Sequence, residues 1–414
     1  MTDELTVWLH GREVGVLKRK RNGATFQYAP RVVAETPGVP LLSVALPVQA
    51  APFDASVTRN WFTGLLPEDR QLQEVQRRFG LEASDFLSLL GEIGWECAGA
   101  VVIAPANSDP PSGSLQTLDD AELAARLVAL PARPFDEAAA LRVSLGGYQA
   151  KIVLTRTSSG WALPLGGAVS THILKPQPAT QWPGLIEAEA WAMAAAASAT
   201  PTAANELLHL EGAPPTLCVT RFDREAVNGG TRRLHQEDSA QALGLAPEAK
   251  YAKSGAPSRS DPSFLKIARI LERYADEPAR QLEQLLQQVT VNVALGNTDA
   301  HAKNYGLLHV APGTVSLSPL YDVAPTHLIN PGMPELGLRV GDTLLLERVT
   351  GSKLVAEAVR WGMTSVRARA VVQDALDALQ AGVIRATERY PASAPRLPSY
   401  VEARIEGLRH DVRT

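Results

Sequence analysis

The sequence contains little cysteine, no marked excess of charge and no long hydrophobic segment. Its 414 residues include two cysteines, Cys97 and Cys218, which are far apart and form no Cys-x-x-Cys pair. This argues against a disulfide framework or a zinc ribbon and favours a reducing compartment. The formal net charge is −4 and the pI is near 6.1. The chain as a whole therefore shows no electrostatic attraction to nucleic acid or to an anionic membrane.

The N-terminal residues lack the features of a signal peptide. Residues 1–4 include the acidic Asp3 and Glu4 in place of a basic start, and no apolar core follows them. The longest apolar stretch, Ala190–Ala197, is much shorter than the roughly 20 residues that cross a bilayer. With 45% hydrophobic and 20% charged residues, the composition is that of a globular protein. We expect a cytoplasmic protein with no membrane partner.

The order of the predicted elements favours an α+β fold. Short alternating segments with turn signals such as Asn22-Gly23 predict strands, whereas the second half is mostly helical. This order is typical of a bilobal protein-kinase-like fold. We predict a β-rich N-terminal subdomain with helices over residues 1–105, a linker or loop over 106–135, the nucleotide-binding part of the N-lobe over 136–200, and a helical C-lobe with catalytic and metal-binding loops over 201–414.

The segment Gly296–Asn304 carries the sharpest chemical signal. Phosphate transfer to a hydroxyl needs a carboxylate that accepts the proton, and magnesium takes oxygen ligands from Asp and Asn. Asp299 and Asn304 stand five positions apart, as do the base and the metal-binding Asn of a protein-kinase catalytic loop. Taken alone, both could equally be residues of a helix end or a turn.

A predicted hairpin follows this segment and leads to a second acidic residue. Two strand-like runs, 305–310 and 315–317, precede Pro319-Leu320-Tyr321-Asp322. Kinases use such a hairpin to bring a second metal-binding Asp opposite the catalytic loop, and Asp322 fits this role. Because Val323-Ala324 follows it in place of Phe-Gly, the sequence gives no basis for assuming the usual activation switch.

Two upstream segments could bind phosphate. Paired glycines in the segment Ser144–Lys151 would let backbone amides approach phosphate, although in isolation a plain hairpin turn explains this segment better. Lys175 ends a short predicted strand and is either a solvated lysine or one that holds the α- and β-phosphates of ATP. The second role needs a carboxylate partner, for which Glu189 is the best placed.

Together these segments resemble the ordered motifs of the HipA family of bacterial toxin kinases. An N-terminal segment, Trp61–Glu68, is similar to the family's N-terminal subdomain, so the resemblance covers most of the chain. The motifs that carry it are Ser144-Leu145-Gly146-Gly147-Tyr148-Gln149-Ala150-Lys151, Thr171–Pro176, Arg221–Arg224, Leu234–Asp238, Gly296–Asn304 and Pro319–Val323.

The resemblance implies a role for each of these residues. Asp299 would be the catalytic base, and Asn304 and Asp322 would hold Mg²⁺. Lys175 would contact the phosphates of ATP, with Glu189 beside it. The residues that would cover the nucleotide are Ser144, Leu145, Gly146, Gly147, Tyr148, Gln149, Ala150 and Lys151, and Ser144 would be the site of a silencing autophosphorylation. By contrast, Arg221–Arg224 is better explained by structural ion pairs, and His235–Asp238 by a capped helix start.

The resemblance also implies partners. The chain would be a serine/threonine protein kinase and the toxin of a HipBA-like toxin–antitoxin pair. A small helix-turn-helix antitoxin, HipB-like, would neutralise it and provide its indirect contact with DNA. A protein such as an aminoacyl-tRNA synthetase would be its substrate, whose phosphorylation halts translation. Two alternatives stay open: a small-molecule phosphotransferase on the same fold, and a catalytically silent kinase-like binding or co-repressor protein.

Overall fold

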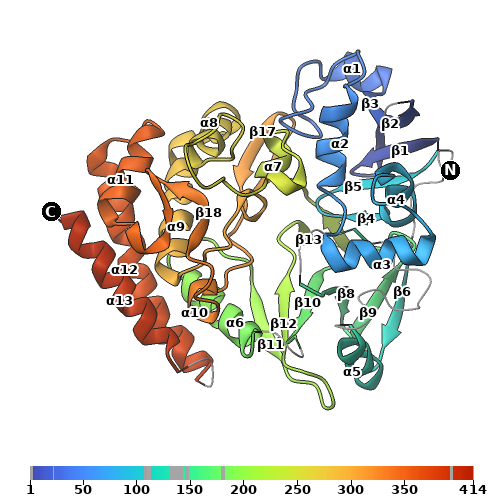
Figure 1. Cartoon of the computed structure of the whole chain (residues 1–414). Coiled ribbons are helices and arrows are strands. Elements are labelled where there is room, and N and C mark those ends of the chain that lie inside the picture. The colour runs from blue at the N-terminus through green and yellow to red at the C-terminus, as the bar shows by residue number, and fades with distance from the viewer. Residues whose placement is uncertain are drawn as a thin grey trace.

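The chain folds into a strand-rich part and a helical part, as Figure 1 shows. This is the α+β arrangement that the sequence predicts. Among the residues described here, no helix is both long and apolar enough to cross a membrane. The structure is a computed structural model and describes residues 3–413 with gaps at 22, 107, 109–112, 131–142, 145–148, 179–181 and 392–394, and only the backbone of 143, 144 and 413.

The first part of the chain forms a domain with its own hydrophobic core, here called the N-terminal domain. Its antiparallel sheet has the order β3-β2-β1-β5, and alternate residues of β1 such as Leu5 and Val7 are fully buried. Helix α2 begins after Asp54, whose carboxylate accepts hydrogen bonds from two backbone amides. The core extends to Ile103. The elements are β1 (Glu4–Leu9), β2 (Arg12–Lys20), β3 (Gly23–Tyr28), α1 (Pro30–Glu35), α2 (Ala55–Thr63), α3 (Asp69–Phe79), α4 (Phe86–Ile93), β4 (Glu96–Cys97) and β5 (Val101–Pro105).

A six-stranded sheet forms the next part, with the order β11-β12-β10-β8-β9-β6. Strand β10 lies inside this sheet between β12 and β8, so its backbone is fixed from both sides. Helix α6 follows β10, and its Trp191 is completely buried in the core of the helical part. The elements are β6 (Ser114–Leu118), α5 (Asp120–Ala129), β7 (Val143–Ser144), β8 (Ile152–Thr157), β9 (Gly160–Leu165), β10 (His172–Pro176), α6 (Leu185–Ala196), β11 (Asn205–Leu208) and β12 (Thr216–Thr220).

The structure adds secondary structure to the range predicted as linker or loop. Within 106–135, residues 114–118 form β6 and residues 120–129 form helix α5, and β6 pairs with β9 along its whole length. Four of the five β6 side chains are exposed, so this edge strand is held mainly by its backbone pairing with β9. The sheet also continues past residue 200, because β11 and β12 pair with each other and β12 pairs with β10.

The rest of the chain is mostly helical, and its long helices α12 and α13 lie at the outer edge (Figure 1). Helix α9 starts with Pro278, which suits a first helical position, and ends before Gly296. The elements are β13 (Arg224–Val227), β14 (Gly230–Arg233), β15 (His235–Asp238), α7 (Ser239–Ala242), η1 (Pro247–Ala249), α8 (Phe264–Tyr274), α9 (Pro278–Leu295), η2 (Ala302–Asn304), β16 (Gly306–Ala311), β17 (Thr314–Leu317), α10 (Thr326–Ile329), β18 (Glu335–Val340), β19 (Thr343–Leu345), η3 (Leu346–Arg348), α11 (Gly351–Arg360), α12 (Ser365–Arg389) and α13 (Leu397–Arg413).

A buried ionic network joins the N-terminal domain to the segment after β12. Glu96 of β4 is 2% exposed and pairs with Arg224 at 2.9 Å, with Arg221 at 3.4 Å and with Arg233. Asp223 pairs with Arg221 at 2.7 Å. The prediction that Arg221–Arg224 forms structural ion pairs is therefore confirmed. Burial alone would raise the pKa of Glu96, but the three arginine charges outweigh burial and lower it to about 2.

Replacement of Glu96 tests this network. Glu96→Ala leaves the arginines without their shared buried carboxylate, so we expect the free energy of unfolding to fall by about 3–5 kcal/mol. Since the folded-state pKa of Glu96 is depressed, its contribution is complete above 4.5 and is lost as the pH falls toward about 2. Urea unfolding across this pH range should show a steeper loss in the wild type than in the variant. Glu35→Ala, which removes an exposed pair with Arg12, is the control, and an equal loss in both variants would contradict the role of Glu96.

Candidate functional site

The loop after α9 carries the first of the predicted site residues. Helix α9 ends at Leu295 and is followed by Gly296, whose φ of +71° is in the left-handed region that favours glycine. A side chain at this position would also collide with Tyr400, because an added Cβ would lie 2.4 Å from its hydroxyl. The chain therefore leaves the helix in a fixed direction and delivers Asp299 and then Asn304 to the interior.

Asp299 accepts a hydrogen bond from the Tyr251 hydroxyl, with 2.6 Å between Oη and Oδ1. Burial raises the pKa of Asp299, and the hydrogen bond from Tyr251 opposes this rise. A carboxylate whose pKa lies above its ordinary value is a better proton acceptor than a solvated one, provided that it stays ionised. The position is therefore suited to general-base chemistry.

Asp322 lies after β17 and connects the two lobes. Its Oδ1 accepts a hydrogen bond from the Lys175 Nζ at 2.6 Å, and its Oδ2 accepts one from the Asn304 Nδ2 at 3.0 Å. The side chain is 47% exposed. Its backbone φ of +58° is uncommon for a residue other than glycine, and such conformations cluster at functional sites. The predicted residues of two separate motifs thus meet at one carboxylate.

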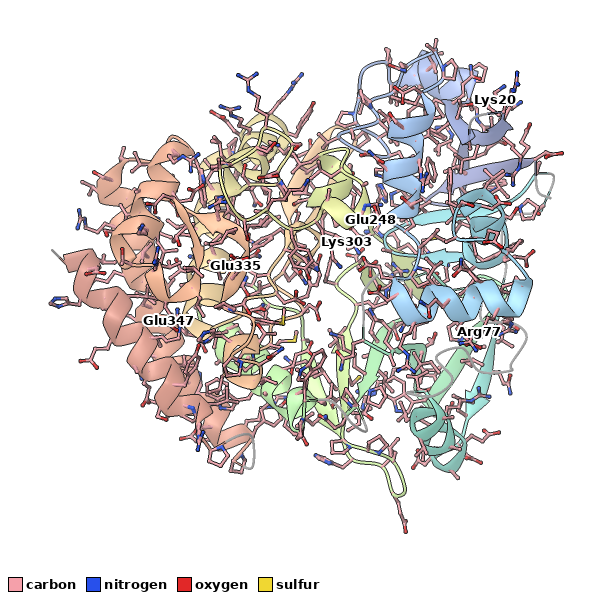
Figure 2. All side chains as sticks on the ribbon, viewed as in Figure 1. Lys20, Arg77, Glu248, Lys303, Glu335 and Glu347 are labelled. Atoms are coloured by element: carbon pink, nitrogen blue, oxygen red, sulfur yellow. The ribbon has the colours of Figure 1, made fainter. Side chains whose placement is uncertain are left out.

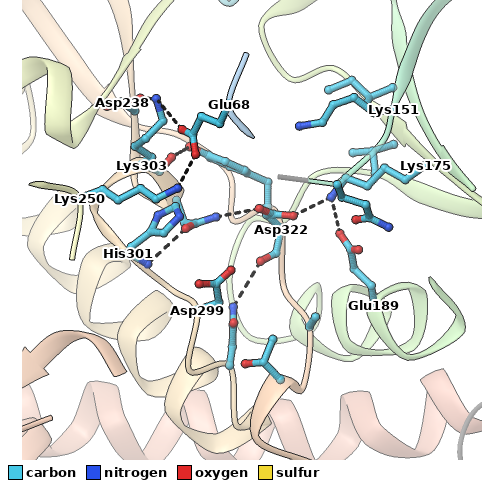
Figure 3. Close-up of a pocket in the computed structure, with 18 of the residues that line it drawn as sticks. Glu68, Lys151, Lys175, Glu189, Asp238, Lys250, Asp299, His301, Lys303 and Asp322 are labelled. Atoms are coloured by element: carbon cyan, nitrogen blue, oxygen red, sulfur yellow. Dashed lines mark hydrogen bonds and ion pairs between the residues drawn. The ribbon is translucent and has the colours of Figure 1, made fainter. Parts of the chain in front are cut away.

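Lys175 is the penultimate residue of β10 and lies between two carboxylates (Figure 3). Besides Asp322, its Nζ contacts Glu189 of α6 at 2.7 Å, and both side chains of this second pair are almost completely buried. Burial alone would lower the pKa of Lys175, but the charges of Asp322 and Glu189 outweigh burial and raise it. Lys175 is therefore a fixed cation, and the solvated alternative considered from the sequence does not apply.

The described end of the predicted nucleotide loop reaches the same cavity. Gln149 and Lys151 both line it, and the side-chain nitrogen of Gln149 is buried without a hydrogen-bond partner among the described residues. Burial, together with the nearby Lys175 charge, lowers the pKa of Lys151 to about 8. Ala150 packs against the core of the six-stranded sheet. The predicted residues that lie outside the described ones are Leu145, Gly146, Gly147 and Tyr148, and of Ser144 only the backbone is described, which pairs with Cys97.

Several residues that the sequence did not single out as functional also line the cavity. Glu68 of the N-terminal domain forms ion pairs with Lys250 and with Lys303, the second at 3.5 Å. Lys303 also pairs with Asp238 at 3.3 Å and lies in the interior between the N-terminal domain and the helical part (Figure 2). The capped helix start at Asp238 is confirmed by its hydrogen bond from the backbone of Gln241.

Signals for some of these residues were present in the sequence. Glu68 is the last residue of the motif that starts at Trp61, and Lys303 stands inside the catalytic-loop motif next to Asn304. Lys250 and Tyr251 belong to a segment that carries no recognisable pattern, so only the folded structure reveals them.

The cavity can accommodate a nucleotide and a metal ion. It has a volume of about 550 Å³, within the range of small-molecule sites. Each oxygen of Asp322 accepts one hydrogen bond and keeps lone-pair capacity for a cation. Magnesium usually takes one or two protein carboxylates and completes its shell with water and phosphate, so Asp322 with Asn304 fits it. Within the described ranges, no three His, Cys, Asp or Glu side chains cluster as a metal site.

The sequence profile of the HipA-like C-terminal domain matches residues 143–383, and that of the HipA N-terminal domain matches residues 5–104. The chain belongs to the HipA family. It is 34% identical over 395 residues to "Putative kinase Y4mE" of Sinorhizobium fredii, covering 93% of this chain and 92% of that protein. It is 27% identical over 307 residues to "Serine/threonine-protein kinase toxin HipA" of Shewanella oneidensis, covering 70% and 69% of the two chains.

A solved structure supports the fold. HipA of Shewanella oneidensis, in a complex with HipB and operator DNA, superimposes with a TM-score of 0.82 at 22% identity and covers 99% of this chain and 96% of that one. The HipA-family chain thus has the α+β kinase-like fold that the sequence predicts. Its N-terminal domain corresponds to the HipA N-terminal domain. Most residues that line the cavity belong to the part matched by the C-terminal profile, and a few, such as Glu68, belong to the part matched by the N-terminal profile.

The Lys175–Glu189 pair can be tested without any ligand. Lys175→Met leaves Glu189 buried without a counter-charge, so we expect the free energy of unfolding to fall by about 3–5 kcal/mol. The double variant with Glu189→Gln removes the unpaired charge and should recover part of this loss in urea unfolding. Lys353→Met, which removes a pair with the exposed Asp342, should cost less than about 1 kcal/mol. A double variant no more stable than Lys175→Met would contradict the pairing.

Proposed function

We propose that this HipA-family protein is an ATP- and Mg²⁺-dependent serine/threonine protein kinase that acts as a toxin in the cytoplasm. The observation that carries the proposal is the Lys175 ammonium held between Glu189 and Asp322, in the cavity that Asp299 and Asn304 also line. Phosphate transfer requires a cation for the phosphates, oxygen ligands for magnesium and a carboxylate at the acceptor. One cavity provides all three.

Each residue has a distinct task in this proposal. Lys175 binds the α- and β-phosphates, and Asp322 with Asn304 holds magnesium. When bound, magnesium neutralises negative charge on the phosphate oxygens. Asp299 orients the acceptor hydroxyl and takes its proton as the new bond to the γ-phosphorus forms and the bond to ADP breaks. Gln149 and Lys151 contact the nucleotide from the other side.

The family relationship supports further parts of the proposal. The similar protein of Shewanella oneidensis is named a serine/threonine-protein kinase toxin, and its solved complex contains HipB and operator DNA. We infer that a small HipB-like helix-turn-helix antitoxin binds this chain and provides its contact with DNA. A protein that supports translation, such as an aminoacyl-tRNA synthetase, is the proposed substrate. Autophosphorylation at Ser144 stays a prediction.

Asp299→Asn is the sharpest test of the chemistry. The amide can still accept the Tyr251 hydrogen bond but takes up no proton, so we expect transfer from labelled ATP to fall by roughly 10²–10⁴-fold. Calorimetry should show that ATP binding is retained. Asp374→Asn, on α12 and outside the lining of the cavity, serves as the control. Transfer within about tenfold of the wild type would contradict the assignment of Asp299.

The acceptor class can be determined in a lysate of the protein's own host. With γ-labelled ATP and magnesium, the wild type should label a protein that stays unlabelled with Asp299→Asn, and mass spectrometry would identify it. Labelled small molecules without labelled protein would instead favour the small-molecule phosphotransferase. ATP binding with no labelled product of either kind would favour the catalytically silent alternative.

A further inference from the structure

Tyr251 makes a contact with the proposed base that no sequence motif indicates. It lies between η1 and α8, and its hydroxyl donates to the Asp299 Oδ1 at 2.6 Å. Its ring meets the His301 ring edge-on, with 4.9 Å between centroids and an interplanar angle of 83°. The side chain remains 40% exposed, so hydrophobic packing does not explain its place. Its polar end is directed at one oxygen of the carboxylate.

The backbone on both sides of Tyr251 is attached to the site. The carbonyl of Lys250 accepts a hydrogen bond from the Ala302 amide, at 3.0 Å, within the catalytic loop. The amide of Ala252 donates to the carbonyl of Gly337 in β18 at 2.8 Å. Because both neighbours are held, Tyr251 is a fixed part of the cavity wall and its orientation toward Asp299 is built into the fold.

The N-terminal domain reaches this arrangement through Glu68. The Glu68 carboxylate pairs with the Lys250 ammonium, which lies 5.5 Å from the centroid of the Tyr251 ring. Glu68 precedes α3 but its side chain does not cap that helix, although acidic side chains are favoured near helix N-termini. The next residue, Asp69, has a φ of +48°, which is strained for a non-glycine residue. The start of α3 thus lacks a side-chain cap and has a strained φ at Asp69, while the Glu68 side chain lines the cavity.

Four titratable or charged side chains face Asp299 besides the neutral His301. Burial raises the pKa of Asp299, and the negative charges of Asp322 and Glu68 act in the same direction. The Tyr251 hydrogen bond and the Lys250 charge act in the opposite direction. Burial together with the same Lys250 charge lowers the pKa of His301 to about 3, so His301 adds no charge near neutral pH.

We propose that Tyr251 is a positioning residue for the Asp299 carboxylate, and that Glu68 supports it from the N-terminal domain through Lys250. Tyr251 holds Oδ1, which leaves Oδ2 for the acceptor hydroxyl. This inference rests on the proposed kinase function and adds that the N-terminal domain takes part in aligning the base. A structural coupling of this kind predicts that the two residues act on the same step.

The test measures labelling of host lysate proteins by the full-length protein at varying concentrations of magnesium-ATP. Tyr251→Phe should lower the rate at saturating ATP by about tenfold and leave the KM for ATP within about twofold of the wild type. Loss of the hydrogen bond should also move the acid limb of the rate to higher pH. Glu68→Gln should lower the rate by a smaller factor, and the double variant should lose less than the product of the two factors.

Two control variants separate this role from general damage. Tyr390→Phe removes a hydroxyl that has no hydrogen-bond partner within the described part of the chain, and Glu35→Gln removes an exposed ion pair of the N-terminal domain. Both should keep the wild-type rate. A Tyr251→Phe rate within about twofold of the wild type, with the acid limb unmoved, would overturn the proposal. A higher rate would also overturn it, since Tyr251 would then compete with the acceptor.

A second measurement keeps the inference testable if the wild type labels nothing, a result that would count against the proposed function instead. Carboxyl ¹³C NMR of aspartate-labelled protein gives the titration of Asp299, whose signal is identified by its absence in Asp299→Asn. The signal should titrate at higher pH in Tyr251→Phe than in the wild type. An unchanged titration would show that Tyr251 does not hold the carboxylate.

Discussion

The site depends on one interaction, the contact of the Lys175 ammonium with two carboxylates from different parts of the chain. Glu189 comes from α6 and Asp322 from the segment after β17, so a single cation fixes the sheet, the helix and the helical lobe relative to one another. The buried Glu189 carboxylate and the part-exposed Asp322 carboxylate would repel each other without it. The same ammonium therefore organises the fold and presents positive charge to the cavity, and any change at this position affects both.

The N-terminal domain is joined to the rest of the chain through buried acids. Glu96 of the N-terminal domain forms ion pairs with three arginines that follow β12 in the chain. A second contact places the acid outside the N-terminal domain. Glu237 of β15 accepts hydrogen bonds from two side chains of that domain, the Ser43 hydroxyl and the Trp61 indole, the latter at 3.1 Å. Breaking such contacts would leave buried charges without partners, which is costly. The domain is consequently held at a fixed distance from the cavity, which is the condition for Glu68 to act there.

The sequence predicts the site well where function requires neighbouring residues, and poorly where it requires tertiary contacts. Asp299 and Asn304 lie in one loop, and Lys175 and Glu189 in consecutive elements, so their spacing together with the kinase-like order of the motifs indicated that they belong to one site. Lys250 and Glu68 are 182 positions apart, and no local pattern links them. Strand β6 was missed for a related reason, since its pairing with β9 uses backbone groups and leaves four of its five side chains exposed.

The charges around the cavity set a condition on any nucleotide that enters it. Carboxylates outnumber cations among its lining residues, so the cavity without a ligand is not a positive one. A triphosphate brought in alone would meet these carboxylates as well as Lys175, whose charge is already paired with Glu189 and Asp322. On the proposed function, a divalent cation would therefore have two tasks: it would reduce the repulsion between ATP and the lining carboxylates, and it would assist phosphate transfer. The lining carboxylates are Glu68, Asp69, Glu189, Asp223, Glu237, Asp238, Asp299 and Asp322, and the cations are Lys151, Lys175, Arg221, Lys250 and Lys303.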